Sequence, residues 1–364
     1  MSSHAPPDVL DPRLGDVAKL ISGRPFEPHP LLRGGQAQTF AGWAWPRLWW
    51  LKALSHQGRG HTMDEERLFE VEPGVRLLAR CRWREDRTSR PTLVLVHGLG
   101  GSNASAYVMG SAELAYEAGM NVVRLNQRNC GRTEHLTPTL YHSGLSGDLR
   151  GVLAELLERD RLSGVLICGF SMGGNLALKM AGELGSEGWE GLVGVCAISP
   201  PVDLSETARH LEHPSNRLYQ WRFVSGLKRM MVRKQELYPR LYELQNLERI
   251  HTVRHFDEPY TAPHGGFSGA EDYYARSSAL PLLPKIRVPT LILHARDDPL
   301  VPPAPFLRPE ASENPNVLVV TPDHGGHVGF VSGEGKAGRF WAEAIVAKFC
   351  RALSSPRPSS PLGF

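Results

Sequence analysis

Short apolar runs recur along the chain, separated by longer stretches with helical periodicity. Six runs are apolar along most of their length: residues 92–96, 121–125, 164–170, 192–198, 290–293 and 317–320. In the stretch 145–157, apolar residues fall on one face at helical spacing. Apolar strands separated by helices are typical of a mostly parallel sheet with helices on both faces. The pattern predicts an α/β fold, preceded by a hairpin-like pair at residues 68–83.

The alternation breaks between residues 203 and 281, which are charged, tyrosine-rich and helix-like and contain no convincing strand. We interpret this segment as a helical cap insertion over the site. Its apolar stripe comprises Phe223, Leu227, Met230 and Met231, and its charged neighbours are Arg222, Lys228, Arg229, Arg233 and Lys234. A basic amphipathic helix can touch anionic lipid. We favour the alternative of a cap helix with a solvated basic face.

Composition narrows the class of protein. The 364 residues include 41 basic and 38 acidic side chains, which does not favour a nucleic-acid partner. Five cysteines, among them Cys168 and Cys196 inside apolar runs, indicate a reducing compartment. With neither a signal-peptide pattern nor an apolar run long enough to span a membrane, we expect a cytoplasmic protein. Residues 1–24 and 354–364 are expected to be flexible ends around a domain at 25–353.

Four of the eight tryptophans lie between residues 40 and 51. Such density can mark a membrane-interface anchor, because indole is apolar and carries one polar group. The alternative, which we favour, is that these rings pack over the domain or line an acyl pocket. The segment therefore also raises the expectation of peripheral membrane contact.

The run 164–170 leads into Gly169-Phe170-Ser171-Met172-Gly173, the pattern of a nucleophile elbow. In such an elbow the serine takes a strained backbone conformation, and small residues two positions away let strand and helix pass closely. A serine hydroxyl needs a neighbouring base, itself oriented by a carboxylate. Ser171 is therefore the candidate nucleophile.

Candidates for the acid and the base follow later strands. Asp297 and Asp298 come after the run 290–293, and His324 and His327 come after the run 317–320. The order serine, aspartate, histidine is that of α/β-hydrolases, and open parallel sheets place their sites beyond the carboxyl ends of strands. A metal site at the two histidines is disfavoured because no other ligand cluster supports it. No cofactor is expected.

Several motifs in order give the chain a family resemblance. They are Gln38-Thr39, His97-Gly98-Leu99-Gly100-Gly101, Asn126-Gln127-Arg128-Asn129-Cys130-Gly131, Tyr141-His142-Ser143-Gly144, the Ser171 elbow through Asn175, Tyr273-Tyr274, and Gly325-Gly326-His327-Val328-Gly329-Phe330. From about residue 25 to 353 the chain resembles the α/β-hydrolase superfamily, most closely its YheT-like, ABHD1/ABHD3-like esterase family. Asn129 departs from the glycine that relatives often carry.

The resemblance implies an α/β-hydrolase fold and a role for each site residue. Asp298 is preferred over Asp297 because the acid of the superfamily typically precedes a Val-Pro pair by three residues. His327 is preferred over His324 because it lies in the Gly-Gly-His-x-Gly match. The oxyanion hole is expected at the backbone N–H groups of Leu99 and Met172. We expect only structural hydrogen bonding from His97 and His294.

These residues predict a serine carboxylic-ester hydrolase that works through Ser171, His327 and Asp298. The resemblance implies short-chain esters or acylglycerols as substrates. An acyltransferase or a thioesterase could use the same three residues, and nothing in the sequence separates these activities. A catalytically silent binding module is disfavoured by the intact set.

Overall fold

An eight-stranded sheet forms the centre of the computed structural model, which describes residues 10–44, 64–334 and 339–354. The strands are β1 (Glu65–Glu72), β2 (Val75–Arg82), β3 (Thr92–Val96), β4 (Asn121–Leu125), β5 (Val165–Phe170), β6 (Leu192–Ile198), β7 (Thr290–Leu293) and β8 (Val317–Val320). Their order across the sheet is β1-β2-β4-β3-β5-β6-β7-β8. Strands β3 to β8 are mutually parallel, and β2 alone runs in the opposite direction, because it pairs antiparallel with both β1 and β4. The predicted α/β fold with a mostly parallel sheet is confirmed.

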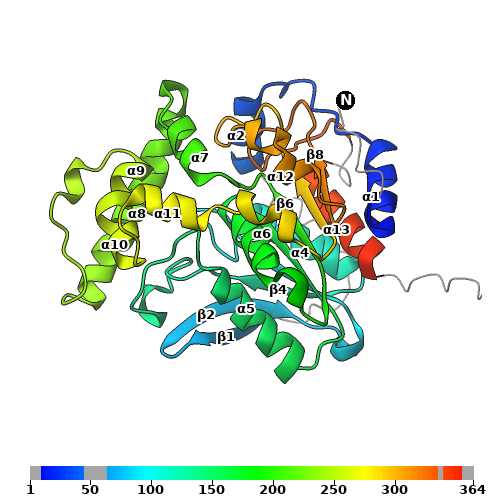
Figure 1. Cartoon of the computed structure of the whole chain (residues 1–364), viewed down its shortest axis with the longest axis horizontal. Helices are drawn as coiled ribbons and strands as arrows, with labels where there is room; N and C mark the ends of the chain where they lie inside the picture. Colours follow the sequence, from blue (N-terminus) through cyan, green and yellow to red (C-terminus); the bar gives the residue numbers. More distant parts are fainter. Residues whose placement is uncertain (1–9, 45–63, 335–338, 355–364) are drawn as a thin grey trace, which may run out of the picture.

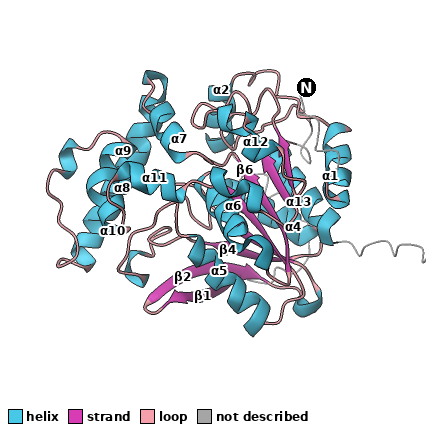
Figure 2. Cartoon of the chain, in the orientation of Figure 1, coloured by secondary structure: helices cyan, strands magenta, loops and turns pink. Residues whose placement is uncertain are grey.

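Helices cover both faces of this sheet (Figures 1 and 2). One face packs on α1 (Pro12–Ser22), α4 (Ala106–Glu117) and α13 (Trp341–Ser354), and the other on α5 (Ser146–Ala154) and α6 (Met172–Leu184). In β3, Val94 and Val96 join the α5–α6 core, whereas Leu93 and Leu95 join the opposite core. Since side chains of a strand alternate between faces, a strand buried on both sides must be apolar throughout.

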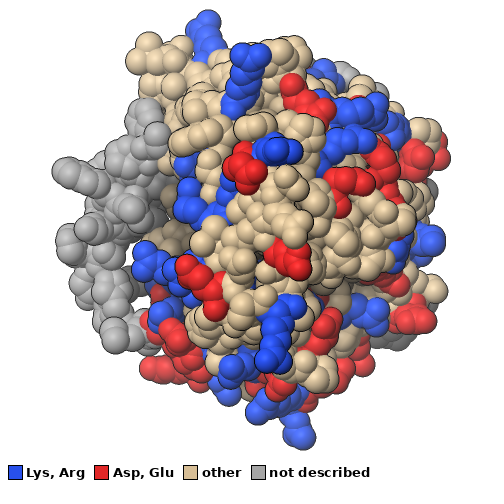
Figure 3. All heavy atoms as spheres, turned by 90° about the vertical axis from the view of Figure 1, so that its left-hand side faces the viewer, with Lys and Arg blue, Asp and Glu red and all other residues tan. Residues whose placement is uncertain are grey.

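The cap lies at the left of Figure 1, beyond the carboxyl ends of the parallel strands. It contains α7 (Leu204–Leu211), α8 (Arg217–Leu237), α9 (Val253–Phe256), α10 (Ala262–His264) and α11 (Ala270–Ser277), with a π-helical turn, η7, at Asp257–Thr261. Residues 203–281 contain no strand, as expected. On the outer face of the cap, Lys and Arg side chains are interspersed with Asp and Glu (Figure 3).

Shorter elements complete the fold. They are α2 (Gly35–Ala44), α12 (Pro309–Ser312), the π-helical turn Glu155–Arg159, and 3-10 turns at Arg87–Ser89, Glu134–Leu136, Gly185–Glu187, Pro214–Asn216, Leu247–Arg249, Leu280–Lys285 and Ala304–Leu307. All five cysteines are buried free thiols. Within the described ranges, no helix combines the length and apolarity that crossing a membrane requires.

Two expectations about flexible or solvated segments are wrong. The N-terminal region, predicted to be flexible, contains α1, whose Leu14, Val17 and Ile21 are buried in the core shared with α13. Their spacing of three and four residues places them on one face, so a polar, proline-bearing sequence still gains a packed helix. Lys234, predicted on a solvated basic face, is fully buried, and its ammonium donates to the carbonyls of Glu134 and Thr137. Burial lowers the pKa of Lys234 to about 8.

The tryptophan-rich segment is described only in part, since residues 45–51 lie outside the described residues. Phe40 in α2 stacks on Tyr219 of α8, with 5.3 Å between ring centroids. The half-exposed ring of Trp43 lies under the guanidinium of Arg222, also on α8, at 3.5 Å. Helix α2 therefore contacts the cap.

The turn between β5 and α6 leaves no space for side chains at two glycines. A Cβ atom at Gly169 would lie 2.1 Å from the carbonyl oxygen of Gly173, and one at Gly173 would lie 2.5 Å from the carbonyl oxygens of Val96 and His97. These atoms are backbone and cannot move away without shifting the strand or the helix. The close approach of β3, β5 and α6 therefore requires glycine at both positions, as expected of the elbow pattern.

Substituting Gly169→Ala is expected to lower the free energy of unfolding by about 3 kcal/mol, the upper range for overpacking a closely packed interior. Gly147→Ala in α5 is the matched control, because a Cβ there meets no atom within 4 Å. The control is expected to raise stability by about 0.5–1 kcal/mol. Urea unfolding followed by circular dichroism measures both. Equal stability of the two variants would contradict this account of the turn.

Candidate active site

Ser171 lies at the sharp turn between β5 and α6. Its backbone angles are φ 51° and ψ −123°, a strained combination for a residue with a side chain. The turn is held by a hydrogen bond from the Ser171 N–H to the Ile198 carbonyl (2.8 Å). A Cβ at Gly98 would lie 2.9 Å from that of Ser171, so the loop after β3 passes directly beside the serine. The hydroxyl is therefore displayed at the carboxyl edge of the sheet.

The structure brings Ser171, His327 and Asp298 into one hydrogen-bonded chain. His327 Nε2 lies 2.9 Å from Ser171 Oγ, and His327 Nδ1 lies 2.8 Å from Asp298 Oδ2. The other carboxylate oxygen, Oδ1, accepts the N–H groups of Leu300 (2.8 Å) and Val301 (3.0 Å). With Nδ1 protonated toward Asp298, Nε2 is an acceptor for the serine hydroxyl.

The Asp298 carboxyl is fully buried but remains suited to the charged form. Burial by itself raises the pKa of a carboxyl, because the charged form loses its hydration. Here the charge and hydrogen bond of His327, with the N–H of Val301, outweigh burial and hold the pKa of Asp298 below its usual value. Asp298 therefore carries the negative charge that an imidazolium at His327 needs.

Asp297, the alternative acid, has a different position. Its Oδ1 accepts the Gly326 N–H (2.9 Å), and its Oδ2 lies 3.1 Å from Nδ1 of the exposed His324. Asp297 therefore braces the loop that carries His327 without bonding to the His327 ring. His324 faces Asp297, and the described residues contain no group of three or more His, Cys, Asp or Glu side chains placed to hold a metal ion.

Helix α2 (Gly35–Ala44) also holds the loop that carries His327, and the sequence analysis did not predict this contact. Thr39 Oγ1 accepts the backbone N–H of His327 (2.8 Å) and donates to the Gly35 carbonyl (2.7 Å). Gln38 bonds both backbone groups of Val331, with Oε1 accepting its N–H at 2.7 Å and Nε2 donating to its carbonyl at 3.0 Å. The family resemblance included the Gln38-Thr39 motif, but its local sequence does not predict a contact between Thr39 and His327, which lies 288 residues away.

The two expected oxyanion donors, Leu99 and Met172, have backbone N–H groups that no acceptor among the described residues occupies. Met172 is the first residue of α6, a position whose N–H has no partner inside the helix. In the loop after β3, the Gly98 N–H donates to the Tyr107 hydroxyl (3.0 Å) and the Gly101 N–H to the Gly98 carbonyl (3.0 Å). Gly100 bonds to the Tyr141 hydroxyl. Leu99 is thereby the loop residue whose N–H lacks a partner in the described part of the chain.

His97 anchors this loop in one tautomer. Its Nδ1 lies 2.7 Å from the Gly98 carbonyl, so it carries the proton, and its Nε2 accepts the Gln127 N–H at 3.1 Å. A second proton, on Nε2, would point at the N–H group of Gln127, so the charged form of the ring is disfavoured. Burial, opposed in part by the Gly98 bond, lowers the pKa of His97 to about 4. The expected structural hydrogen bonding of His97 is confirmed.

His294 is held by weaker polar contacts than His97. Its ring nitrogens make no close hydrogen bond to a described residue, the backbone of Val301 lies near enough to favour the protonated ring, and Nδ1 lies 3.9 Å from Asp298 Oδ2. The ring instead stacks on Phe306, with 4.2 Å between centroids. Burial lowers the pKa of His294 to about 4, so the ring is a neutral aromatic wall behind the acid.

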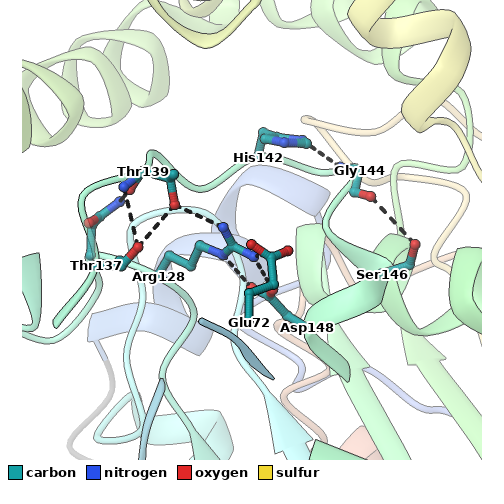
Figure 4. Close-up of polar contacts among 9 residues, drawn as sticks. Glu72, Arg128, Thr137, Thr139, His142, Gly144, Ser146 and Asp148 are labelled. Carbon is teal, nitrogen blue, oxygen red and sulfur yellow. Dashed lines mark hydrogen bonds and ion pairs between the residues drawn. The ribbon is translucent and has the colours of Figure 1, made fainter. Parts of the chain in front are cut away.

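An ion pair holds the loop between β4 and α5 beside the site (Figure 4). Arg128 binds Asp148 through two guanidinium nitrogens and also reaches Glu72 (2.9 Å) and Thr139 Oγ1 (2.8 Å). Both members of the Arg128–Asp148 pair are buried. Asn129 follows with φ 62°, a left-handed conformation that asparagine tolerates better than most residues, which explains how it replaces a glycine.

A cavity extends from Ser171 into the cap. Its body side includes Leu99, Ser171, Met172, Leu300 and His327, and its cap side includes Leu204, Ala208, Leu211, Leu227, Asp257 and Tyr274. Most of this lining is apolar. Asn175 ties the two sides together, because it donates to the carbonyls of Ser143 and Ser277 and accepts the Ala279 N–H.

An elbow serine, a histidine and a buried aspartate on a mostly parallel sheet define the class of α/β hydrolases. The family model described as "alpha/beta hydrolase fold" matches residues 91–334. The chain therefore belongs to the α/β-hydrolase family, and within it to the YheT-like branch with its ABHD-type relatives.

Among similar proteins, the putative esterase YheT of Escherichia coli is 35% identical over 71% of this chain and 75% of its own. The human phospholipase ABHD3 is 27% identical over 74% of this chain, which spans 65% of the phospholipase. The Pyrococcus furiosus esterase Pf2001 shares the fold, with a TM-score of 0.51, 18% identity and coverage of 80% of this chain and 95% of the other.

His97, His142 and His294 are expected to stay neutral well below pH 6.5, since burial lowers the pKa of each to about 4. Between about pH 4 and pH 6.5, these histidines bind protons in the unfolded chain but not in the folded chain. The free energy of unfolding therefore falls as the pH falls through this range. Each histidine contributes about 1.4 kcal/mol per pH unit to the slope of the free energy of unfolding against pH. Asp257 contributes a slope of opposite sign, because its pKa is raised to about 6 and the folded chain binds its proton first, so it cancels the contribution of one histidine. Imidazole ¹⁵N shifts recorded against pH test this, and a His97 midpoint near 6.5 would contradict it.

Proposed function

We propose that this protein is a serine carboxylic-ester hydrolase in which Ser171 is the nucleophile, His327 the general base and acid, and Asp298 the orienting carboxylate. The observation that carries the proposal is the continuous hydrogen-bonded chain from Asp298 through His327 to Ser171. Each link has the length of an ordinary hydrogen bond, and the three residues follow three different strands, β5, β7 and β8, at the carboxyl edge of the sheet.

The steps follow from this geometry. Ser171 Oγ attacks the ester carbonyl carbon while its proton moves to His327 Nε2, and Asp298 stabilises the resulting imidazolium. The carbonyl oxygen becomes an oxyanion and accepts the N–H groups of Leu99 and Met172. His327 then gives its proton to the alcohol oxygen as the bond from this oxygen to the carbonyl carbon breaks. The alcohol departs, and the acyl group remains attached to Ser171. Water, deprotonated by His327, hydrolyses this ester and restores Ser171.

Short-chain esters or acylglycerols are the substrates we propose. The mostly apolar cavity beside Ser171 suits an acyl or alkyl chain, since burying apolar surface is favourable. Relatives named as an esterase and a phospholipase support the same class.

Hydrolysis of p-nitrophenyl esters of rising acyl length tests the proposed reaction. The wild-type protein is expected to release p-nitrophenol with a preference for one range of lengths, because the cavity limits the chain. Ser171→Ala serves as the blank. Rates equal to the blank for every ester, or full activity in Ser171→Ala, would refute the mechanism.

The two adjacent aspartates provide a matched pair. Asp298→Asn is expected to lower kcat by about 10⁴, as loss of the orienting carboxylate leaves the imidazole in the wrong tautomer. Asp297→Asn keeps a carbonyl oxygen that can accept the Gly326 N–H, so its kcat is expected to fall by less than about tenfold. Steady-state kinetics on one ester decides between them, and the reverse ranking would make Asp297 the acid.

Thr39 is expected to act as a positioning residue for His327. Thr39→Val removes the acceptor of the His327 N–H, and a shift of the ring should lower kcat by up to about a hundredfold. KM should change little because Thr39 does not line the cavity. Thr39→Ser keeps the hydroxyl and should restore kcat. A kcat equal to wild type in Thr39→Val would remove Thr39 from this role.

A further inference from the structure

A carboxylate is buried in the cap wall of the cavity that holds Ser171 and His327. Asp257 lines this cavity and is only 6% exposed. It begins the π-helical turn Asp257–Thr261, which interrupts the helical run between α9 and α10. Single π-helical turns are uncommon and occur often at functional sites. The mechanism proposed above does not use this residue.

The neighbours of Asp257 leave its charge uncompensated. The Tyr274 hydroxyl donates to Oδ2 at 2.8 Å, and the Thr261 side chain also donates. These two neutral donors are the partners that the described residues supply, and no Lys, Arg or His pairs with the carboxylate among them. Burial raises the pKa of Asp257 to about 6, so the group is still mainly ionised at neutral pH. A buried charge without a counter-charge is costly, which makes it a candidate for a role in binding.

The carboxylate has capacity for a further donor. Its two oxygens offer about four lone-pair directions, and Tyr274 and Thr261 occupy two of them. Around it, the cavity lining is mainly apolar, with Leu204, Ala208, Leu211 and Leu227 on the cap side. The lining also contains uncharged hydroxyl side chains, among them Ser143, Thr207 and Tyr273, but Asp257 is the only carboxylate among the described residues that line this cavity. A donor group of a ligand would therefore find its one carboxylate acceptor here.

We propose that Asp257 is a specificity-determining residue that accepts a hydrogen bond from an O–H or N–H group of the substrate, remote from the ester that Ser171 attacks. This inference rests on the proposed function and narrows its substrate class. The preferred ester carries a hydroxyl or protonated amine on its acyl or alcohol part, and a purely hydrocarbon ester is a poorer substrate. An aliphatic chain would leave Asp257 without this donor.

The test compares esters that differ only in the donor. For the acyl part, the set is p-nitrophenyl hexanoate with its ω-hydroxy and ω-amino derivatives. For the alcohol part, the pair is propyl butyrate and the monobutyrate ester of glycerol. The wild-type protein is expected to favour the donor-bearing member of at least one set by about tenfold or more in kcat/KM, as hydrogen bonds to a charged group are strong. Comparing kcat/KM for the ω-hydroxy and ω-amino esters shows whether the site prefers a neutral donor or a cationic donor.

Asp257→Asn is nearly isosteric and removes the charge. It is expected to abolish the donor preference and to leave kcat/KM for the hydrocarbon esters within about threefold of wild type. Asp272→Asn is the matched control, because the partly exposed Asp272 of α11 does not line the cavity, and the preference should persist in this variant.

Each outcome is decisive. No donor preference in the wild-type protein, or an equal loss for all esters in Asp257→Asn, would overturn the inference and give Asp257 a structural role only. In these cases the hydrolase proposal stands, because hydrocarbon esters are still cleaved. A wild-type protein that cleaves no ester would overturn both.

Discussion

The close passage of β5 into α6 is the constraint on which the rest of the site depends. Backbone atoms of β3 and α6 come so near Gly169 and Gly173 that neither position has space for a Cβ. This contact forces Ser171 into its left-handed conformation and lifts its hydroxyl above the sheet edge. The same turn begins α6 at Met172, whose N–H then points away from helical partners. One packing contact therefore positions both the candidate nucleophile and a candidate oxyanion donor.

The opposite half of the site is held by contacts that are distant in sequence. The loop carrying His327 is braced by Asp297 on one side and by Thr39 of α2 on the other. A Cβ at Gly35 would lie 1.7 Å from the Asp297 carbonyl oxygen, so the start of α2 presses directly on the acid loop. Helix α2 also contacts the cap through Phe40 and Tyr219. The N-terminal segment thus joins the histidine, the acid loop and the cap.

Local pattern was sufficient for most of the fold. Runs that are apolar on both faces are typical of strands buried from both sides, so the parallel sheet was predictable. The helix-like segment 203–281 interrupts this pattern, which indicated an insertion. The elbow pattern likewise predicted where Ser171 lies. Properties set by tertiary contacts were not predictable: the burial of Lys234 depends on the carbonyls of Glu134 and Thr137. The contact of Thr39 with His327 and the uncompensated charge of Asp257 likewise depend on tertiary contacts and were not predictable from local sequence.

The central claim is that the Asp298–His327 pair activates Ser171 as a nucleophile. A fluorophosphonate probe measures this directly, since the serine oxygen forms a bond to phosphorus and displaces fluoride only when a base takes its proton. The account predicts rapid labelling of the folded protein, with mass spectrometry locating the adduct on Ser171, and labelling that nearly disappears in Asp298→Asn. An unlabelled wild-type protein, or an adduct on another residue, would contradict it.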